Sequence, residues 1–423
     1  MGHTLAEKIL AAKCGREQVF PGEFINARVD LVLASELSAV VAIEEFTKIK
    51  GARVFDPQKV VFVMDHFTPA KDIQSAEIVK RCREFAREHG LRFFDVGRAG
   101  IQHVLLPEQG MVSPGDLIAG ADSHTCTYGF LGAFGTGIGS TDAAAAMALG
   151  ELWLRIPKSV LLEYYGSPPP WVGGKDLILH TIGRIGVEGA RYMAMEMRGE
   201  ALDRLGMADR FAMANMAIEA GAKTGLIAAD KQTMEYVRSR GAPDGLVLTS
   251  DPDAEYAAHH EFDVSTFEPF VAVPYSPENV VPASELSAVE IDQVVIGLCT
   301  NGNLEDLRAA ASVLKGRKIH PRVRVVVIPG SQKVYLDALR EGLLEVFIEA
   351  ECTVSTPTCG PCLGGHMGVL AAGERCLSTS NRNFRGRMGH PESEVYLANP
   401  YVAAATALAG HIASPAEVLE SPL

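Results

Sequence analysis

Three cysteines in two short loops are the residues of this chain best suited to chemistry. Cys299 opens the segment Cys-Thr-Asn-Gly, and Cys359 and Cys362 are the two ends of the segment Cys-Gly-Pro-Cys. Both segments follow apolar runs, so each thiol is expected just beyond a strand. Three thiolates rather than four suit a metal centre that keeps one position open, as a Lewis acid requires. The sequence therefore indicates a metalloenzyme.

The nature of the metal centre stays open on spacing alone. Soft thiolates select either zinc or an iron–sulfur cluster. His366 follows the second loop closely and could complete a structural zinc site with the three cysteines. The remaining cysteines stand in helical or apolar contexts and are predicted to be packing residues: Cys14, Cys82, Cys126, Cys352 and Cys376.

Polar clusters follow predicted strands at three further places. They are Asp65-His66, Asp122-Ser123-His124 and Asn381-Arg382-Asn383. In open α/β sheets, ligands bind beyond the carboxyl ends of the strands, so we expect these clusters and the cysteines to share one cleft.

Three histidines in the chain have carboxylates as candidate partners. The histidines are His66, His103 and His124, and the carboxylates are Asp65, Asp122 and Glu219. A carboxylate can hold an imidazole protonated and make it a proton donor. The alternative for each is a buried histidine with a structural hydrogen bond.

Two other polar groups could bind a substrate. Asn215 and Glu219 are four residues apart in a helix predicted over 207–222, so they share one face of it. That face could bind a substrate or simply be exposed to solvent. Arg382, Arg385 and Arg387 could clamp carboxylates with their guanidinium forks, or form a solvated turn.

A glycine-rich run at 132–139 resembles a dinucleotide-binding loop. It lies downstream of Asp122-Ser123-His124 rather than in a first βαβ unit, and it lacks a P-loop lysine. We interpret it as a tight turn that packs a helix against a sheet, and we reject NAD binding.

The elements that must position these residues alternate between strands and helices, which indicates an α/β fold. Strands are predicted at 60–64, 116–119, 294–296 and 323–328, and helices at 75–88, 142–154, 304–314 and 334–347. Proline-rich stretches at 166–170 and 269–282 predict boundaries near residues 160 and 285, and so three domains: 1–160, 161–285 and 286–423.

Composition excludes several classes of protein. A net charge of −13 and a pI near 5.4 argue against nucleic-acid binding. No apolar run approaches the ~20 residues of a membrane span, and the charged amino terminus lacks the apolar core of a signal peptide. We therefore expect a cytoplasmic protein with free or metal-bound thiols.

Taken together, the motifs resemble those of the 3-isopropylmalate dehydratase large subunits, a family of the aconitase superfamily of iron–sulfur hydro-lyases. The resemblance runs from Thr4 to Gly410 and is most specific at four segments: 120–125, 299–302, 359–364 and 380–387. It implies three α/β/α domains around a central cleft. It also implies that a swivelling domain, absent from this chain, belongs to a separate small subunit.

The same resemblance implies a 4Fe–4S cluster bound by Cys299, Cys359 and Cys362, with Asn381 in contact with it. It assigns catalytic roles to Asp65, His66, His103, Asp122, His124 and Glu219. It assigns substrate binding to Ser123, Asn215, Arg382 and Arg387.

The implied substrate is a small hydroxy di- or tricarboxylic acid, with isopropylmalate in leucine biosynthesis favoured. Homoaconitate in lysine biosynthesis and dimethylmalate are the close alternatives. The chain departs from the family pattern at Ser35, Val40, Leu298 and Asn303, and loss of a cation at Asn303 bears on the substrate. Two readings from other classes stay open: a zinc hydrolase with Asp65, His66, His103 and Asp122 as ligands, and a non-catalytic scaffold.

Overall fold

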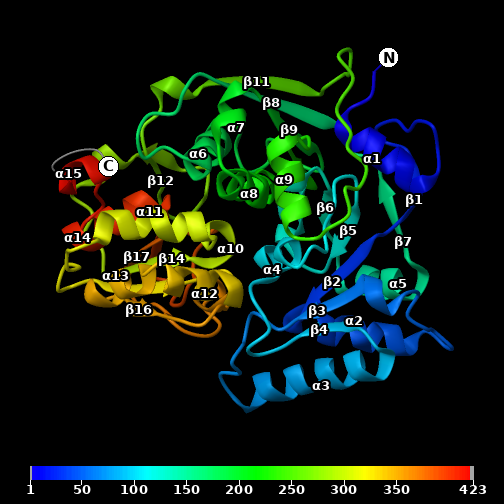
Figure 1. The fold of residues 1–423 in the computed structure, drawn as a ribbon, viewed down its shortest axis with the longest axis horizontal. Helices are drawn as coiled ribbons and strands as arrows, with labels where there is room; N and C mark the ends of the chain where they lie inside the picture. Colours follow the sequence, from blue (N-terminus) through cyan, green and yellow to red (C-terminus); the bar gives the residue numbers. More distant parts are fainter. Residues whose placement is uncertain (1, 420–423) are drawn as a thin grey trace.

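The chain folds into four β-sheets with helices packed around them, and the computed structural model describes residues 2–419 (Figure 1). The amino-terminal third lies at the right of Figure 1, the middle third at the top and the carboxy-terminal third at the left. Strands and helices alternate through most of the chain, which confirms the predicted α/β class.

The first sheet has five parallel strands in the order β4-β3-β2-β5-β6. They are β2 (Leu31–Ser35), β3 (Val60–Val63), β4 (Arg92–Phe94), β5 (Leu117–Gly120) and β6 (Phe134–Gly137). The helices of this region are α1 (Leu5–Cys14), α2 (Glu36–Lys48), α3 (Ile73–His89), α4 (Gln102–Glu108) and α5 (Ser140–Leu149). Strands β2, β3 and β5 are buried throughout, as expected for parallel strands covered on both faces. The strands predicted at 60–64 and 116–119 and the helix predicted at 75–88 are confirmed.

Two predictions for this region are wrong. The helix predicted at 142–154 ends as α5 at Leu149, because Gly150 takes the left-handed conformation with φ of 73°. The following residues form strand β7 (Glu151–Arg155), which pairs antiparallel with β1 (Phe24–Arg28). Residues of β7 alternate between exposed and buried, as expected of a strand with one face exposed to solvent. The glycine-rich run at 132–139, expected to be a tight turn, contains the edge strand β6.

The second sheet has four parallel strands in the order β10-β9-β8-β11. They are β8 (Ser159–Tyr165), β9 (Ala194–Arg198), β10 (Thr224–Leu226) and β11 (Ala258–Asp263). Its helices are α6 (Gly174–Ile185), α7 (Glu200–Arg204), α8 (Met207–Asn215) and α9 (Lys231–Ser239). The helix predicted over 207–222 is shorter than expected, because α8 ends at Asn215 and a 3-10 turn, η3 (Met216–Ala220), follows it.

The third large sheet has seven strands in the order β13-β12-β18-β17-β14-β15-β16. Five are parallel: β14 (Gln293–Gly297), β15 (Arg324–Ile328), β16 (Thr353–Val354), β17 (Arg375–Ser378) and β18 (Glu394–Leu397). Two antiparallel strands, β12 (Phe270–Ala272) and β13 (Val280–Pro282), complete it. Its helices are α10 (Leu298–Asn301), α11 (Leu304–Leu314), α12 (Gln332–Arg340), α13 (Leu343–Glu349), α14 (Pro400–Ala409) and α15 (Pro415–Val418).

In this region the predicted strands at 294–296 and 323–328 and the predicted helix at 304–314 are confirmed. The single helix predicted at 334–347 is wrong, because Gly342 takes φ of 75° and separates α12 from α13. The domain boundaries near residues 160 and 285 stay predictions. The second sheet begins at Ser159, whereas β12 and β13 of the third large sheet precede residue 285.

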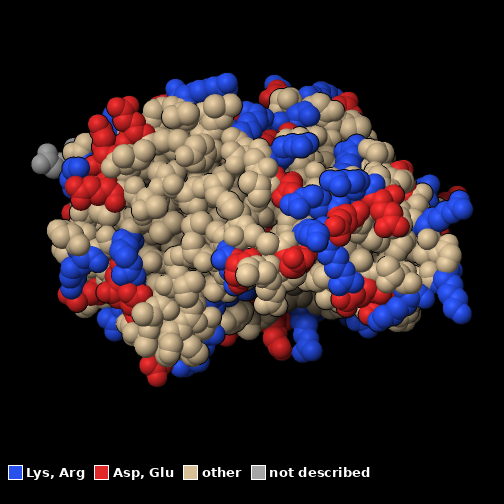
Figure 2. Space-filling model, turned by 90° about the horizontal axis from the view of Figure 1, so that it is seen from below, with Lys and Arg blue, Asp and Glu red and all other residues tan. Residues whose placement is uncertain are grey.

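The distribution of surface charge and the lengths of the helices bear on nucleic-acid and membrane binding. On the face shown in Figure 2, Lys and Arg are interspersed with Asp and Glu rather than gathered into one basic stripe. Within residues 2–419, no helix is both long enough and apolar enough to cross a bilayer.

Candidate active site

The predicted site residues meet in one cavity of about 340 Å³, here named the catalytic cavity. Its lining comes from the carboxyl ends of strands in two different sheets, since β3 and β5 lead to Asp65 and Asp122, and β14 leads to Cys299. The predicted residues that line it are Asp65, His66, His103, Asp122, Ser123, His124, Cys299, Cys359, Cys362, Arg382 and Arg387. Three others, Asn215, Glu219 and Asn381, lie just behind this lining and bond to residues in it or to one another.

A sharp turn after β14 presents Cys299 to the cavity. Gly297 has φ of 111°, and a Cβ there would lie 1.9 Å from the carbonyl oxygen of Ile328, so only glycine fits. Leu298 also takes a positive φ of 69°, which is strained for a residue with a side chain. The chain thereby turns directly into α10 with Cys299 in its first turn.

The second cysteine loop is tied to the first sheet by two hydrogen bonds. The backbone N–H of Cys359 and the hydroxyl of Thr358 both donate to the carbonyl oxygen of Asp65, at 2.7 and 3.0 Å. This double contact fixes the loop of Cys359 and Cys362 against the residue that precedes His66.

Hydrogen-bond donors surround the thiols. Asn381 donates to Sγ of Cys299 at 3.0 Å, and Arg387 donates to Sγ of Cys362 at 3.4 Å. The neighbouring thiols of Cys299 and Cys359, together with the Arg387 guanidinium, hold the pKa of Cys362 well below its ordinary value. Asn381 is itself fixed by Oδ1 of Asn215 at 3.0 Å. The environment of Cys362 therefore favours a thiolate, the form in which cysteine binds metals.

The zinc site suggested by spacing lacks its fourth ligand. The three thiols meet in the catalytic cavity, where the thiol of Cys362 contacts those of Cys299 and Cys359, and His366 does not line this cavity. His366, the suggested fourth ligand, instead has Nε2 at 2.7 Å from the carbonyl oxygen of Pro69.

The alternative zinc site of a hydrolase is not formed either. Asp65, His66, His103 and Asp122 are not grouped at metal-binding distances among the described residues. Glu36, Asp65 and His66 do approach one another closely, but the Glu36 carboxylate accepts backbone N–H groups and Asp65 accepts from His66.

His66 is held as a cation. Its Nδ1 lies 2.6 Å from Oδ1 of Asp65, whose second oxygen accepts the backbone N–H of Gln102 at 2.8 Å. Burial alone would lower the pKa of His66, but Asp65, with Glu36 and Asp122 nearby, raises it to about 10. Because Nδ1 is occupied by Asp65, Nε2 of His66 is the atom with a proton to give in the cavity.

The other two histidines belong to one chain of ionic contacts. Nε2 of His103 lies 3.0 Å from Asp122, and Nε2 of His124 lies 2.8 Å from Glu219, which also accepts from Arg382 at 2.7 Å. Burial alone would raise the pKa of Asp122, but His103 and the other histidines hold it well below its usual range. Burial and the Arg382 guanidinium lower the pKa of His124. The surroundings therefore shift the pKa values of two imidazoles in opposite directions, since the pKa of His66 is raised and that of His124 is lowered.

Sequence reasoning missed the part that Glu36 takes in the site. Its carboxylate, at the start of α2, accepts the backbone N–H groups of Asp65, His66 and Phe67 at 3.0, 2.8 and 2.5 Å. It is fully buried, and burial raises its pKa. The available signal was an acidic residue soon after the apolar run 31–34, the same pattern that singled out Asp65.

Lys175 was missed as well. It is buried in the first turn of α6, and its ammonium donates to the carbonyl oxygens of Thr379 and Ser380, the two residues before Asn381. Burial lowers its pKa to about 7. A lysine at a helix start, where the dipole disfavours a cation, was the only signal in the sequence.

Glu36→Gln is expected to weaken both the fold and the reaction. The amide cannot accept all three N–H groups, so we expect a loss of about 1–3 kcal/mol of stability and a lower pKa of His66. Glu7→Gln is the matched control, because Glu7 is also buried and accepts a backbone N–H, from Thr4 at 2.8 Å, in α1. Denaturant unfolding and turnover per bound iron separate the two variants. Equal turnover in both would show that Glu36 has only a structural part.

None of the four departures from the family pattern lines the catalytic cavity: Ser35, Val40, Leu298 and Asn303. Asn303 instead borders a separate hollow at the start of α11. Leu37, next to Glu36, does line the catalytic cavity, together with Ile101 and Leu363. The cavity therefore has an apolar part beside its ionic groups.

Comparison with known proteins gives one consistent result. The model of the aconitase family (aconitate hydratase) matches residues 7–288 and 282–410. The chain is 62% identical to a protein of Moorella thermoacetica named 3-isopropylmalate dehydratase large subunit, over 99% of this chain and 100% of that protein. A protein of Thermodesulfovibrio yellowstonii with the same name is 60% identical, with the same coverage. The fold is similar to that of Thermococcus kodakaraensis aconitase X, with a TM-score of 0.50 and 14% identity over 89% of this chain and 88% of that one.

Proposed function

Because the chain belongs to the aconitase family, we propose that it is the large subunit of a hydro-lyase that interconverts 2- and 3-isopropylmalate in leucine biosynthesis, in the cytoplasm. The observation that carries the proposal is the full-length similarity to large subunits of that name, joined to a cavity in which thiols, imidazoles and guanidiniums converge. Members of the aconitase family generally depend on iron–sulfur clusters.

Cys299, Cys359 and Cys362 would hold a 4Fe–4S cluster, which when bound supplies an open iron that binds and polarises a substrate hydroxyl. Asn381 and Arg387 would orient the thiolates through the hydrogen bonds described above. Such donors also tune the electronic properties of a centre of this kind.

His66 would deliver the proton that accompanies loss of the hydroxyl. Asp65 accepts at Nδ1 and keeps the ring charged, so Nε2–H is the donating group. Asp122, kept ionised by His103 and His124, adds a negative charge 4.0 Å from Nε2 of His66 and keeps the ring oriented.

Substrate carboxylates would bind to the cationic side of the cavity. Arg382 donates through Nε to Glu219, and its other N–H groups, without a hydrogen-bond partner among residues 2–419, would form a carboxylate fork, with Arg387 and the hydroxyl of Ser123 in the same lining. Leu37, Ile101 and Leu363 offer an apolar wall suited to a branched alkyl group. This wall favours isopropylmalate over acids with a further carboxylate at that position.

A small subunit would complete the enzyme. Both relatives described above are named large subunits, which implies a partner chain. We propose that the partner carries the swivelling domain, closes the catalytic cavity and brings the base that removes the carbon-bound proton.

A substrate panel tests the proposal. The chain, purified without oxygen together with its small subunit, should contain about four irons and four sulfides. It should equilibrate the two isopropylmalates faster than homoaconitate or dimethylmalate. A preference for homoaconitate would instead assign the enzyme to lysine biosynthesis. A colourless, zinc-loaded protein would support a hydrolase, and a cluster with no turnover of any acid would support a scaffold.

A further inference from the structure

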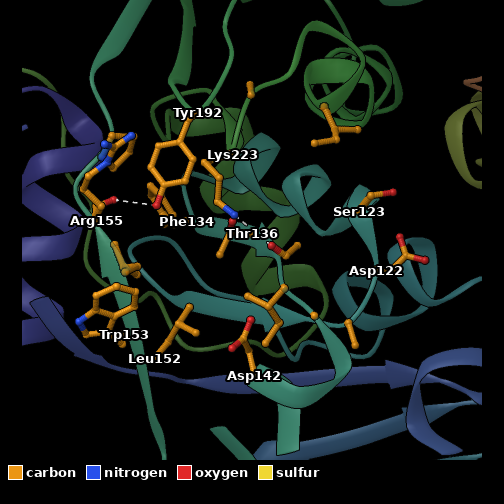
Figure 3. A pocket seen from close by; sticks show the side chains of 18 of the residues that line it. Asp122, Ser123, Phe134, Thr136, Asp142, Leu152, Trp153, Arg155, Tyr192 and Lys223 are labelled. Atoms are coloured by element: carbon orange, nitrogen blue, oxygen red, sulfur yellow. Dashed lines mark hydrogen bonds between the residues drawn. The ribbon is translucent and has the colours of Figure 1, made fainter. Parts of the chain in front are cut away.

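A second hollow, here named the side pocket, opens next to the catalytic cavity (Figure 3). Its volume is about 510 Å³, and Asp122 and Ser123 line both spaces. Its walls come from β6, β7 and the loops that carry Tyr192 and Lys223. None of the chemistry described above uses this pocket beyond the two shared residues.

Two polar groups of the side pocket, Thr136 and Arg155, differ from the rest in what they bind within residues 2–419. Thr136 is 1% exposed, yet its hydroxyl has no hydrogen-bond partner within residues 2–419. Lys223 lies between Tyr192 and Thr136 in Figure 3, and its ammonium donates to the carbonyl oxygen of Gly137 at 3.1 Å. Arg155 stacks over the Tyr192 ring at 4.7 Å and has no carboxylate partner in the described part of the chain. Asp142 in the same lining acts electrostatically on Lys223, and Asp122 is bound to His103. Arg155 is therefore the charged group of the pocket that has no carboxylate partner in residues 2–419, and an acidic side chain would pair with it.

The rim and walls of the side pocket are apolar. Phe24 and Trp153 stack on each other, with ring centroids 4.8 Å apart and planes at 9°, on the small sheet of β1 and β7. They are 58% and 67% exposed, unusual for such large rings. Phe134 and Leu152 form a buried wall of the same pocket. An exposed aromatic pair beside a pocket has the composition of an interface hot spot.

We propose that the side pocket is the docking site of the small subunit, and that it receives an apolar segment of that subunit carrying an acidic side chain. The proposal rests on the proposed function, since that function supplies the partner. Arg155 matches the charge of the acidic side chain, while the Phe24–Trp153 pair covers the apolar part of the segment. A free small acid would leave this pair on the rim exposed, whereas a protein segment would cover it.

Docking at the side pocket would place the small subunit next to the catalytic cavity. A segment seated in the side pocket touches Asp122 and Ser123, which the catalytic cavity shares. Because the two spaces share this border, a subunit bound at the side pocket lies beside the catalytic cavity, within reach of its neighbouring residues.

Trp153→Ser tests the site in the cluster-loaded chain. We expect the Kd for the small subunit to rise about 30-fold or more, as for loss of a central interface tryptophan. Ile348→Ser is the matched control, because Ile348 is 63% exposed on α13 and does not line the side pocket. Arg155→Met, which removes the charge but keeps a long side chain, should weaken binding and make the remaining affinity less dependent on salt. Equal affinities for all variants and the unaltered chain would overturn the proposal.

Fluorescence distinguishes a docked subunit from a small ligand. The chain has two tryptophans, so Trp171→Phe leaves Trp153 as the single reporter. Small subunit should shift its emission to shorter wavelength, whereas a shift with isopropylmalate alone would make the pocket a small-molecule site and overturn the docking proposal. Failure of the proposed function would instead appear as no turnover by the unaltered pair, while its binding still reports on the pocket.

Discussion

Cys359→Ser is expected to abolish cluster assembly and leave a folded, colourless protein. Serine keeps the size of the side chain but replaces a soft thiolate by a hydroxyl that iron–sulfur clusters bind poorly. The loop should stay in place, because its anchors, the backbone N–H of residue 359 and the hydroxyl of Thr358, survive the change. Iron and sulfide should fall from about four each to near zero.

Cys352→Ser is the control for this experiment. Cys352 and Cys359 are both 7% exposed, but burial raises the pKa of Cys352 to about 12 and its thiol is not one of those that meet in the catalytic cavity. The control should keep its full cluster and lose only the ~1–3 kcal/mol that a buried, unbonded hydroxyl costs. Full iron in the Cys359 variant would remove that residue from the ligand set. Loss of iron in both would point to a folding defect.

The local features of the site were readable from the sequence because each follows a buried strand. Asp65-His66, Asp122 and Cys299 all stand just after apolar runs, and parallel strands present such residues at one edge of a sheet. The helix predicted at 304–314 has the same bounds in the structure, since its apolar residues repeat with helical period.

Contacts between sheets were not readable in the same way. Thr358 bonds to the carbonyl oxygen of Asp65 across 293 positions, and no local pattern encodes how two separate sheets face each other. Lys175 reaches the strand-end segment before Asn381 only through tertiary packing. Errors in the elements had a local cause: the alanine-rich pattern of α5 runs into the apolar residues of β7, and Gly150 alone marks the break.

His66→Ala is expected to keep the cluster and lower turnover by about 10²–10⁴-fold, the usual contribution of a positioned acid. The cysteines and their donors do not contact this side chain in the hydrogen bonds described, so iron content should not change. A near-normal rate would exclude His66 as the proton donor.

The pH dependence gives the same assignment a second test. With its pKa raised to about 10, His66 stays protonated through neutral pH, so activity that needs the cation should be lost only as pH rises through about 10. Asp65→Asn removes the main cause of the raised pKa while keeping the size of the side chain. Burial still lowers the pKa of His66, and only Glu36 and Asp122 are left to raise it, so the alkaline fall in kcat/KM should move to lower pH. An alkaline limb that stays in place in the Asp65→Asn variant would mean that another group donates the proton.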